Sequence, residues 1–260
     1  VKYMIDNFNI THVEIEDDNF TLKKRHSMPI LKYFKKLKRE GYPLKLSFPN
    51  GVMIDRLDRE HIFAMKDAGT EIIYLPVESG ELKNLISMNK PAATEHLEKS
   101  LEVARWCAEA ELEAGAFFII GYPGGRVSQK SLQKIIYDTY PDSILEEDSN
   151  SIWIRGEDKK SFMETVKFAR KLVQEGVKYV TPLIATPYPG TDLYDICEKF
   201  GWLKNLDHSE MVTTISYQNP KVDFINIDTP WCSSDEAFAR WKYLSDLFEI
   251  KHNVIKAVGN

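Results

Sequence analysis

The residues of this sequence that could do chemistry follow short apolar runs. In "EIIYLPVESG" (71–80), an apolar run is followed by Glu78 and Ser79. A second run, "THVEIE" (11–16), ends in a cluster of four polar residues: Glu16, Asp17, Asp18 and Asn19. Adjacent carboxylates repel one another, so such a cluster is stable when it is solvated or when it accepts hydrogen bonds from a ligand amine. Both stretches are therefore candidate sites for a ligand that carries hydroxyls or a cationic amine.

Three further stretches place polar or turn-forming residues after apolar runs. They are "KLSFPNG" (45–51), "FIIGYPGG" (118–125) and "ATPYPGTDLY" (185–194). Each stretch alone is more typical of a turn than of a site, but five in succession favour a common binding rim. The residues predicted to bind a cofactor are Glu16, Asp17, Asp18, Asn19, Ser47, Asn50, Glu78, Ser79, Ile119, Ile120, Gly121, Pro187, Tyr188 and Pro189.

The elements that must position these residues alternate along the chain. We expect strands at 11–16, 44–48, 71–77, 116–121 and 177–185. We expect helices at 28–41, 58–69, 93–115, 160–176 and 192–201, most of them ending in a glycine of the kind that terminates helices. Strands that alternate with helices are typical of a parallel α/β fold, in which ligands bind outside the carboxyl ends of the strands. The candidate residues fall at those ends.

Two segments depart from the alternation. In residues 126–158, "SLQKIIYDTY" (131–140) favours a short helix and "SILEEDSNS" (143–151) favours a loop, so this insertion after the fourth strand is a lid, an interaction loop or a tolerated surface segment. The tail ends in a helical pattern that Ser233 or Ser234 would cap. We therefore expect a core at 1–202 and a C-terminal extension at 203–260 that packs on it.

Composition excludes several classes of protein. The 260 residues carry 34 basic and 39 acidic side chains, a net charge of −5, which gives no support to nucleic-acid binding. No apolar run is long enough to cross a membrane, and no signal-peptide pattern opens the sequence. The three cysteines, Cys107, Cys197 and Cys232, lie far apart, which favours a reducing, cytoplasmic compartment over a disulfide framework. The scattered histidines and cysteines indicate no metal site.

The order of the motifs resembles the core of the radical S-adenosylmethionine (SAM) superfamily. The stretches that carry the resemblance are "EDDNF", "YLPVESG" with "LISMNK", "FIIGYPG", "FMETVKFA" and "TPYPGTDLY", within residues 1 to 201. They are most similar to the branch that includes cobalamin-dependent enzymes and methylthiotransferases. The resemblance implies a partial (β/α)6 barrel, similar to a TIM barrel, in which strands two to six are present. Its rim would bind SAM beside a [4Fe-4S] cluster.

The resemblance also implies a role for each group of candidate residues. Glu16 to Asn19 would hold the methionine amino group of SAM, Glu78 and Ser79 the ribose and carboxylate, and the stretches 119–121 and 187–189 would flank the adenine. The whole enzyme would generate a 5′-deoxyadenosyl radical to modify a small-molecule or peptide substrate. It would take electrons from a donor such as flavodoxin or ferredoxin, and cobalamin would be a further cofactor. No membrane or nucleic-acid partner is implied.

Two departures from the family pattern stand out. The CxxxCxxC motif that holds the cluster is missing, and the helical start "VKYMID" indicates that the first strand and its loop are missing with it. We therefore expect a truncated enzyme that is inactive as it stands. In the family "GxPGE" runs directly into the next helix, whereas here about thirty residues intervene between "GYPGG" and "GEDKKSFMET". A non-catalytic barrel that binds or scaffolds is one alternative, and an unrelated enzyme such as an aldolase is another, although no phosphate loop is present.

Overall fold

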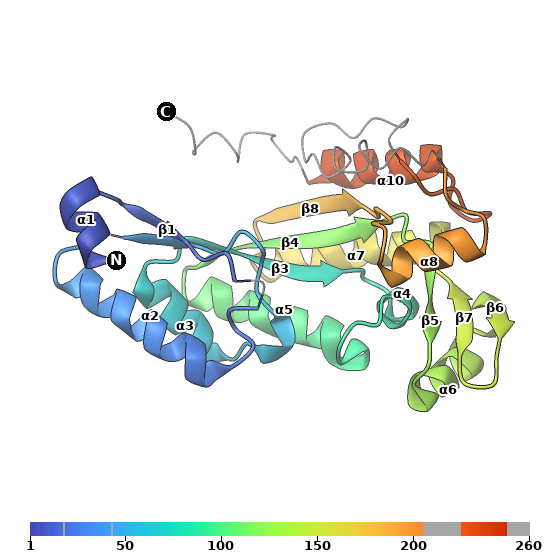
Figure 1. Ribbon diagram of the computed structural model, residues 1–260, viewed down its shortest axis with the longest axis horizontal. Coiled ribbons are helices and arrows are strands. Elements are labelled where there is room, and N and C mark those ends of the chain that lie inside the picture. The colour runs from blue at the N-terminus through green and yellow to red at the C-terminus, as the bar shows by residue number, and fades with distance from the viewer. Residues whose placement is uncertain (18, 43, 205–224, 249–260) are drawn as a thin grey trace. The chain divides into compact units, whose positions relative to one another are not determined.

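The computed structural model describes residues 1–17, 19–42, 44–204 and 225–248 (Figure 1). Contacts between residues divide the chain into two compact units. The first unit consists of Val1–Val77, Glu95–Phe117 and Ala169–Tyr179, and the second of Glu78–Thr94, Phe118–Phe168 and Val180–Asn260. The predicted division into a core at 1–202 and an extension at 203–260 stays a prediction.

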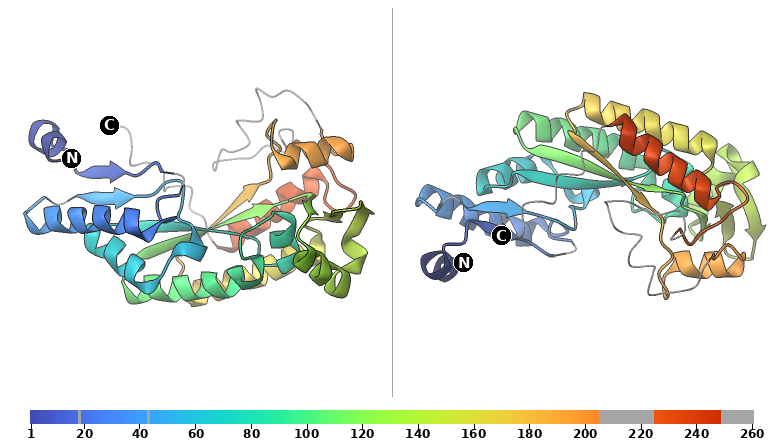
Figure 2. Two further views of the ribbon diagram at one scale, coloured as in Figure 1. Left: turned by 60° about the horizontal axis from the view of Figure 1, so that its bottom comes forward. Right: turned by 90° about the horizontal axis from the view of Figure 1, so that it is seen from above.

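The first unit begins with helix α1 (Lys2–Phe8) and a pair of parallel strands, β1 (His12–Glu14) and β2 (Lys45–Ser47), in which Val13 lies opposite Leu46. A parallel bridge from Leu46 to Thr70 continues this pairing toward β3 (Ile72–Glu78). Helices α2 (Lys24–Arg39) and α3 (Arg59–Ala68) follow β1 and β2 and lie side by side in both Figure 1 and Figure 2. A short 3-10 helix, η1 (Ile54–Arg56), precedes α3.

The three-stranded sheet has the order β3-β4-β8, with β4 at Glu113–Ile120 and β8 at Tyr179–Ile184. Lys178 N donates to Ala114 O over 2.8 Å, and Ala185 N donates to Ile120 O over 2.9 Å. Because both partners advance in the same direction, β4 and β8 are parallel. Alternate residues of β3 are buried, as expected for a strand packed on one face. The carboxyl ends of all three strands belong to the second unit.

Helices α5 (Ala93–Glu109), α7 (Lys159–Gln174) and α8 (Asp192–Lys199) lie where the periodicity predicts helices, but α5 ends earlier than expected, because residues 113–115 belong to β4. The short helix α4 (Leu82–Ser87) after β3 lies outside the predicted helical ranges. The chain is thus a mixed α/β protein with parallel strands, as predicted. Helix α10 (Ser234–Leu247) begins at a capping box in which Ser233 Oγ accepts from Glu236 N. Trp241 Nε1 of α10 donates to Pro182 O of β8 over 3.0 Å.

The insertion folds into a structure of its own, and the expectation of a loop at 143–151 is wrong for its first half. Strands β5 (Gly124–Val127), β6 (Ile144–Glu147) and β7 (Ile152–Arg155) form an antiparallel sheet in the order β5-β7-β6. Helix α6 (Lys130–Thr139), which was predicted, and the 3-10 turn η2 (Pro141–Ser143) connect β5 to β6. Asp148 closes the turn before β7 by accepting from Asn150 N and Ser151 N, each over 2.8 Å. The polar residues of β6 can form a strand because the backbone of β7 provides their hydrogen-bonding partners.

Candidate binding site at the strand ends

Glu78 ends β3 in an uncommon conformation. Its backbone φ is 66°, in the left-handed region that residues other than glycine rarely adopt and that is often found at functional sites. Its Oε1 accepts from Lys90 Nζ over 2.9 Å, and the two side chains are 18% and 17% exposed. A carboxylate and an ammonium therefore lie together at the end of the strand. Sequence reasoning missed Lys90, although the "LISMNK" motif contains it.

Ser79 holds the loop that carries Glu78. Its side chain is fully buried, and its Oγ lies 3.2 Å from Thr165 Oγ1 on α7. The same Oγ accepts from Glu81 N over 3.2 Å and from Asn84 Nδ2 over 3.3 Å. Gly80 is seated so closely that an added Cβ would lie 2.6 Å from Thr165 Cα. The Ser79 hydroxyl thus bonds to Thr165, Glu81 and Asn84, and these bonds fix the loop that carries Glu78.

The end of β4 is fixed by a buried carboxylate. Gly121 N donates to Glu157 Oε1 over 3.1 Å, and Ile120 O already accepts from Ala185 N. Gly121 has φ 72°, and an added Cβ would lie 2.9 Å from Ala237 Cβ of α10. Two backbone polar groups of the stretch 119–121, which was predicted to flank the adenine, are therefore occupied by partners within the protein. The half-buried side chain of Ile119 remains the apolar surface that this strand end offers.

Glu157 joins the insertion to α10. It is 1% exposed, and its Oε1 lies 3.3 Å from Arg240 Nη1, whose residue is 7% exposed. Burial raises the pKa of Glu157 to about 7, against the opposing effects of Gly121 N–H and Arg240. Glu157 Oε2 is buried and has no partner among the described residues. The sequence does not single out Glu157, although the acid lies in "GEDKKSFMET", because nothing local marks it as buried.

A second buried charge fixes the base of the insertion. Lys83 of α4 is 4% exposed, and its Nζ donates to Gly156 O over 2.8 Å and lies 3.6 Å from Asp158 Oδ2. Burial lowers the pKa of Lys83, which Asp158 opposes. An added Cβ on Gly125 would lie 1.8 Å from Ser87 O. The insertion is therefore seated tightly on α4, a packing that argues against a freely moving lid.

The loop after β8 carries the last group of predicted residues. Pro187 is buried, Tyr188 is half-buried and Pro189 is exposed. The Tyr188 hydroxyl is buried without a partner among the described residues, and burial raises the pKa of Tyr188. Thr191 Oγ1 donates to Tyr188 O over 2.6 Å and accepts from Tyr194 N, which caps α8. The loop is thus fixed at its junction with α8.

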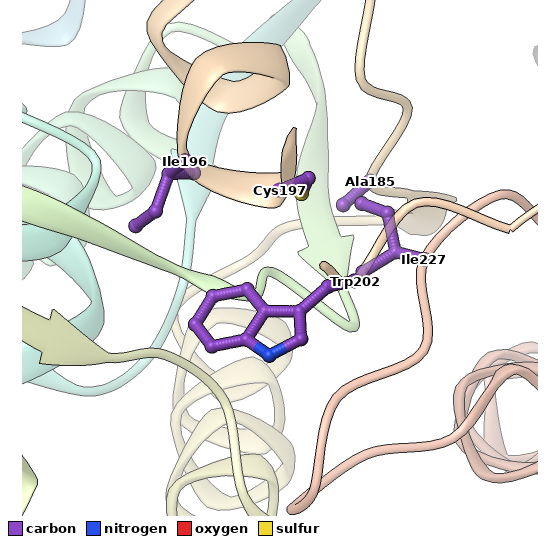
Figure 3. Close-up of a cluster of buried hydrophobic side chains, with 5 residues drawn as sticks. All are labelled: Ala185, Ile196, Cys197, Trp202 and Ile227. Atoms are coloured by element: carbon purple, nitrogen blue, oxygen red, sulfur yellow. The ribbon is translucent and has the colours of Figure 1, made fainter. Parts of the chain in front are cut away.

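An apolar cluster supports this loop and the end of β4 (Figure 3). Its buried members are Ala185, Ile196, Cys197, Trp202 and Ile227. Half-buried Ile119 and Tyr122 pack against them, so the end of β4 and the loop after β8 share one core. The three predicted groups of the second unit, at the ends of β3, β4 and β8, lie on neighbouring strands. That neighbourhood makes them one candidate site.

The predicted residues of the first unit form a separate group. Asn50 Nδ2 donates to Glu16 O over 3.1 Å and lies 3.5 Å from Glu16 Oε2. Asp17 accepts from Asn19 N over 2.8 Å, and Ser47 Oγ lies 2.8 Å from His12 Nε2. Glu16, Asp17, Asn19 and Asn50 are exposed. Asp18 lies outside the described residues. The structure therefore gathers the predicted residues in two groups, one in each unit.

The cysteines do not fit an iron–sulfur cluster. A cluster needs several thiolates close together, whereas Cys107, Cys197 and Cys232 are each buried, and burial raises the pKa of each thiol to about 12. In the described part of the chain, no three His, Cys, Asp or Glu side chains are grouped to hold a metal ion. Nor does any described helix combine the length and apolar character needed to span a membrane.

The chain is similar in sequence to two curated methyltransferases. It is 26% identical over 188 residues to an uncharacterised methyltransferase from Pyrococcus horikoshii. This alignment covers 72% of this chain and 32% of the relative. It is 30% identical over 121 residues to cytidylyl-2-hydroxyethylphosphonate methyltransferase from Streptomyces wedmorensis, which covers 45% of this chain and 21% of the relative. The chain thus spans about a third or less of these proteins. No family model matches the sequence.

The fold is similar to that of the radical SAM methyltransferase TsrM from Kitasatospora setae. One TsrM structure, solved with cobalamin and a [4Fe-4S] cluster, superposes with a TM-score of 0.55 at 12% identity over 78% of this chain and 33% of TsrM. Another, with tryptophan substrate and the SAM analogue aza-SAM, gives 0.57 at 13% identity over 79% of this chain and 34% of TsrM. At these identities the likeness describes the fold.

Proposed function

We propose that this chain is the SAM-binding part of a methyltransferase of the radical SAM type. The observation that carries the proposal is the Glu78–Lys90 pair at the end of β3, beside the fixed ends of β4 and β8. The fold similarity to TsrM and the sequence similarity to two methyltransferases support it. Because the chain spans about a third of these proteins, the substrate and the methylated product belong to the whole protein.

The groups at the strand ends suit the chemical features of SAM. Its ribose offers two hydroxyl donors, which a carboxylate such as Glu78 accepts, as an acid does in dinucleotide sites. Its carboxylate would pair with the ammonium of Lys90, so that SAM divides the existing Glu78–Lys90 ion pair between two of its own groups. Ile119 and Pro187 offer apolar surface to the adenine. Ser79 and Glu157 hold the two loops in place.

For the first unit taken by itself, we propose that its polar group binds an ammonium such as the methionine amino group of SAM. Glu16, Asp17 and Asn19 offer exposed oxygen acceptors, and Asn50 orients Glu16 by donating to its carbonyl. An ammonium needs such acceptors. Asp18 and Ser47 are part of the same proposal, with Ser47 bonded to His12.

The [4Fe-4S] cluster does not fit the cysteines of this chain, so its ligands would be residues outside these 260. Reductive cleavage of SAM to a 5′-deoxyadenosyl radical, the cobalamin cofactor and an electron donor such as flavodoxin or ferredoxin belong to the proposed whole protein. A cytoplasmic location is part of the same proposal. The alternative is a barrel that binds without catalysis, which the buried, separated cysteines favour.

Calorimetric titration with SAM tests the binding proposal. We expect the wild-type chain to bind SAM, and Glu78→Gln or Lys90→Met to weaken binding about 10-fold or more, because each variant removes a hydrogen bond to a charged group worth about 1.5–3 kcal/mol. Lys99→Met is the matched control, since Lys99 forms a comparable pair with Glu102 on α5. Absence of SAM binding to a folded wild-type chain, or equal affinities in all four proteins, would contradict the proposal.

Reconstitution with iron and sulfide under anaerobic conditions separates the two candidate functions. The isolated chain should bind SAM without producing 5′-deoxyadenosine, whereas a longer protein that supplies three neighbouring cysteines should produce it. Production of 5′-deoxyadenosine by the isolated chain would show that its own residues hold a cluster. A longer protein that holds a cluster and still leaves SAM intact would favour the non-catalytic barrel.

A further inference from the structure

Charge is segregated along this sequence far more than its net value of −5 indicates. Residues 19–39 contain no acid, and their basic side chains are Lys23, Lys24, Arg25, Lys32, Lys35, Lys36, Lys38 and Arg39. Residues 135–154 contain no basic side chain, and their acids are Asp138, Asp142, Glu146, Glu147 and Asp148. The first segment forms α2 and the second forms the outer part of the insertion. Opposite patches of this kind steer association.

The basic surface is a stripe along α2. Arg25, Lys32, Lys36 and Arg39 are exposed and recur at spacings of seven, four and three, which places them on one side of the helix. Within the described residues, Arg25, Lys32 and Arg39 form no ion pair, while Lys36 lies 3.6 Å from Glu40. Like charges at these spacings repel. A partner that brings acidic groups would relieve that repulsion.

An apolar groove of about 440 Å³ lies between α2 and α3 beside this stripe. Its apolar lining residues are Met28, Leu31, Phe63 and Ala64, and its charged lining residues are Lys32, Lys35, Arg59, Glu60 and Asp67. Lys35 pairs with Asp67 and Arg59 with Glu109, whereas Lys32 forms no ion pair within the described residues. The Arg59 guanidinium lies 4.2 Å from the centre of the Phe63 ring. The surface therefore combines a place for an apolar side chain with Lys32 and Arg39 of the stripe, two cations that form no ion pair in the described part of the chain. A helix face that contacts only water would not explain the apolar groove beside it.

The acidic surface, which we call the acidic tip, consists of residues 137–147 at the end of α6, η2 and β6. It exposes two large apolar side chains, Tyr137 at 44% and Leu145 at 36%. Asp138, Asp142 and Glu147 are exposed beside them and form no ion pair within the described residues, whereas Glu146 pairs with Lys199 over 2.8 Å. The acidic tip thus complements the groove and the stripe: its apolar side chains protrude, and, among the described residues, it carries carboxylates without an ion pair where the stripe carries cations without one.

We propose that the acidic tip of one copy of this chain binds the groove and basic stripe of a second copy. Leu145 or Tyr137 would enter the groove, and Asp142 and Glu147 would face Lys32 and Arg39. Both surfaces belong to the same chain, so the contact is heterologous and leaves a free tip and a free groove at the ends of each assembly. RNA or an anionic membrane would use the cations but not the apolar groove, and either would repel the acidic tip.

The contact is small, so the association is weak and depends on salt. A helix face and a strand tip bury less area than a standard interface of about 1,600 Å². We therefore expect a dissociation constant of about 10–100 µM at low ionic strength, weakened about 10-fold by 300 mM salt because exposed charges are screened.

Sedimentation velocity on the wild-type chain over a range of concentrations tests the proposal. Lys32→Glu with Arg39→Glu, and separately Asp142→Lys with Glu147→Lys, should each give a monomer. A mixture of the two variants should associate, because one retains the intact tip and the other the intact groove. Lys160→Glu with Lys171→Glu on α7 changes the net charge equally and should associate as the wild type does. Circular dichroism checks that each variant is folded.

Three results would overturn the proposal. One is a wild-type chain that stays monomeric at about 200 µM in low salt, well above the expected dissociation constant. Another is an association that both variants retain, which would place the interface elsewhere. The third is a mixture of the two variants that stays monomeric.

Binding of fluorescent oligouridylate or anionic phosphatidylserine vesicles to the basic stripe, with no self-association, would assign that stripe to a different partner. SAM titration is independent of all these outcomes.

Discussion

Replacing Glu157 by glutamine tests the coupling between burial and charge at the end of β4. The carboxylate is 1% exposed, holds Gly121 N–H and contacts Arg240. Its pKa is about 7, compared with 4.5 for the ordinary side chain. That difference corresponds to about 3 kcal/mol of folding free energy, at about 1.4 kcal/mol for each pKa unit.

The sign of the pH dependence follows from the direction of the shift. Because the folded pKa lies above the unfolded one, the protein prefers the neutral acid. The stabilising contribution is complete below about pH 4.5 and is lost as the pH rises through about 7. Glu157→Gln cannot ionise, and its carbonyl oxygen can still accept from Gly121 N. The free energy of unfolding of the wild type relative to the variant should therefore fall by about 3 kcal/mol between pH 4.5 and pH 8.

Urea unfolding at several pH values, followed by tryptophan fluorescence, measures this difference. Four tryptophans, Trp153, Trp202, Trp231 and Trp241, report on the second unit, where Glu157 lies. Glu198→Gln on α8 is the control, because its carboxylate is exposed and should leave the profile of the wild type unchanged. Parallel curves for the wild type and Glu157→Gln across this pH range would refute the reasoning that burial governs the Glu157 carboxyl.

Two further predictions concern the base of the insertion and the first unit. Gly156→Ala should lower the free energy of unfolding by about 2–3 kcal/mol, because the new Cβ would lie 2.0 Å from the backbone oxygen of Tyr122. Gly201→Ala, with nothing within 4 Å, should cost about 1 kcal/mol from its positive φ alone, and equal losses in urea unfolding would contradict the packing argument. His61 is buried with Nε2 2.8 Å from Ser27 Oγ, and burial lowers the pKa of His61 below 6.5. The stability it contributes is present above pH 6.5 and lost as the pH falls toward its folded pKa, so His61→Gln should make unfolding less sensitive to acid, as circular dichroism would show.

The alternation of apolar runs and helical segments predicted the fold well because burial enforces it. A strand forms at each of the five predicted positions, in two separate sheets, although β1 and β2 are shorter than expected. The insertion was harder to predict, because "ILEE" has no apolar alternation, and β6 forms through pairing with β7. The residues of β6 alone do not indicate that β7 will pair with them. Strand pairing between segments distant in sequence decides the outcome.

The candidate site was predictable in position and only in part in composition. Glu78 follows a buried strand, so its place at the strand end could be predicted from the sequence. Lys90 reaches Glu78 only because α4 is short and turns the chain back, and the sequence does not specify that turn. The burial of Ser79 depends on Thr165 of α7, which lies 86 residues later. Side-chain partners that distant cannot be read from local spacing.

The insertion leaves the end of β4 undisturbed because its two ends meet. Gly156 N donates to Pro123 O over 2.9 Å, and Glu157 N donates to Tyr122 O over 2.8 Å. An added Cβ on Gly124 would lie 3.0 Å from Gly156 N, so the chain leaves and re-enters the turn at nearly one point. The thirty residues between "GYPGG" and "GEDKK" therefore separate these motifs in sequence but not in space. Glu157 reaches Gly121 as though it followed the turn directly, and an acid that the sequence places far from β4 becomes the group that fixes its end.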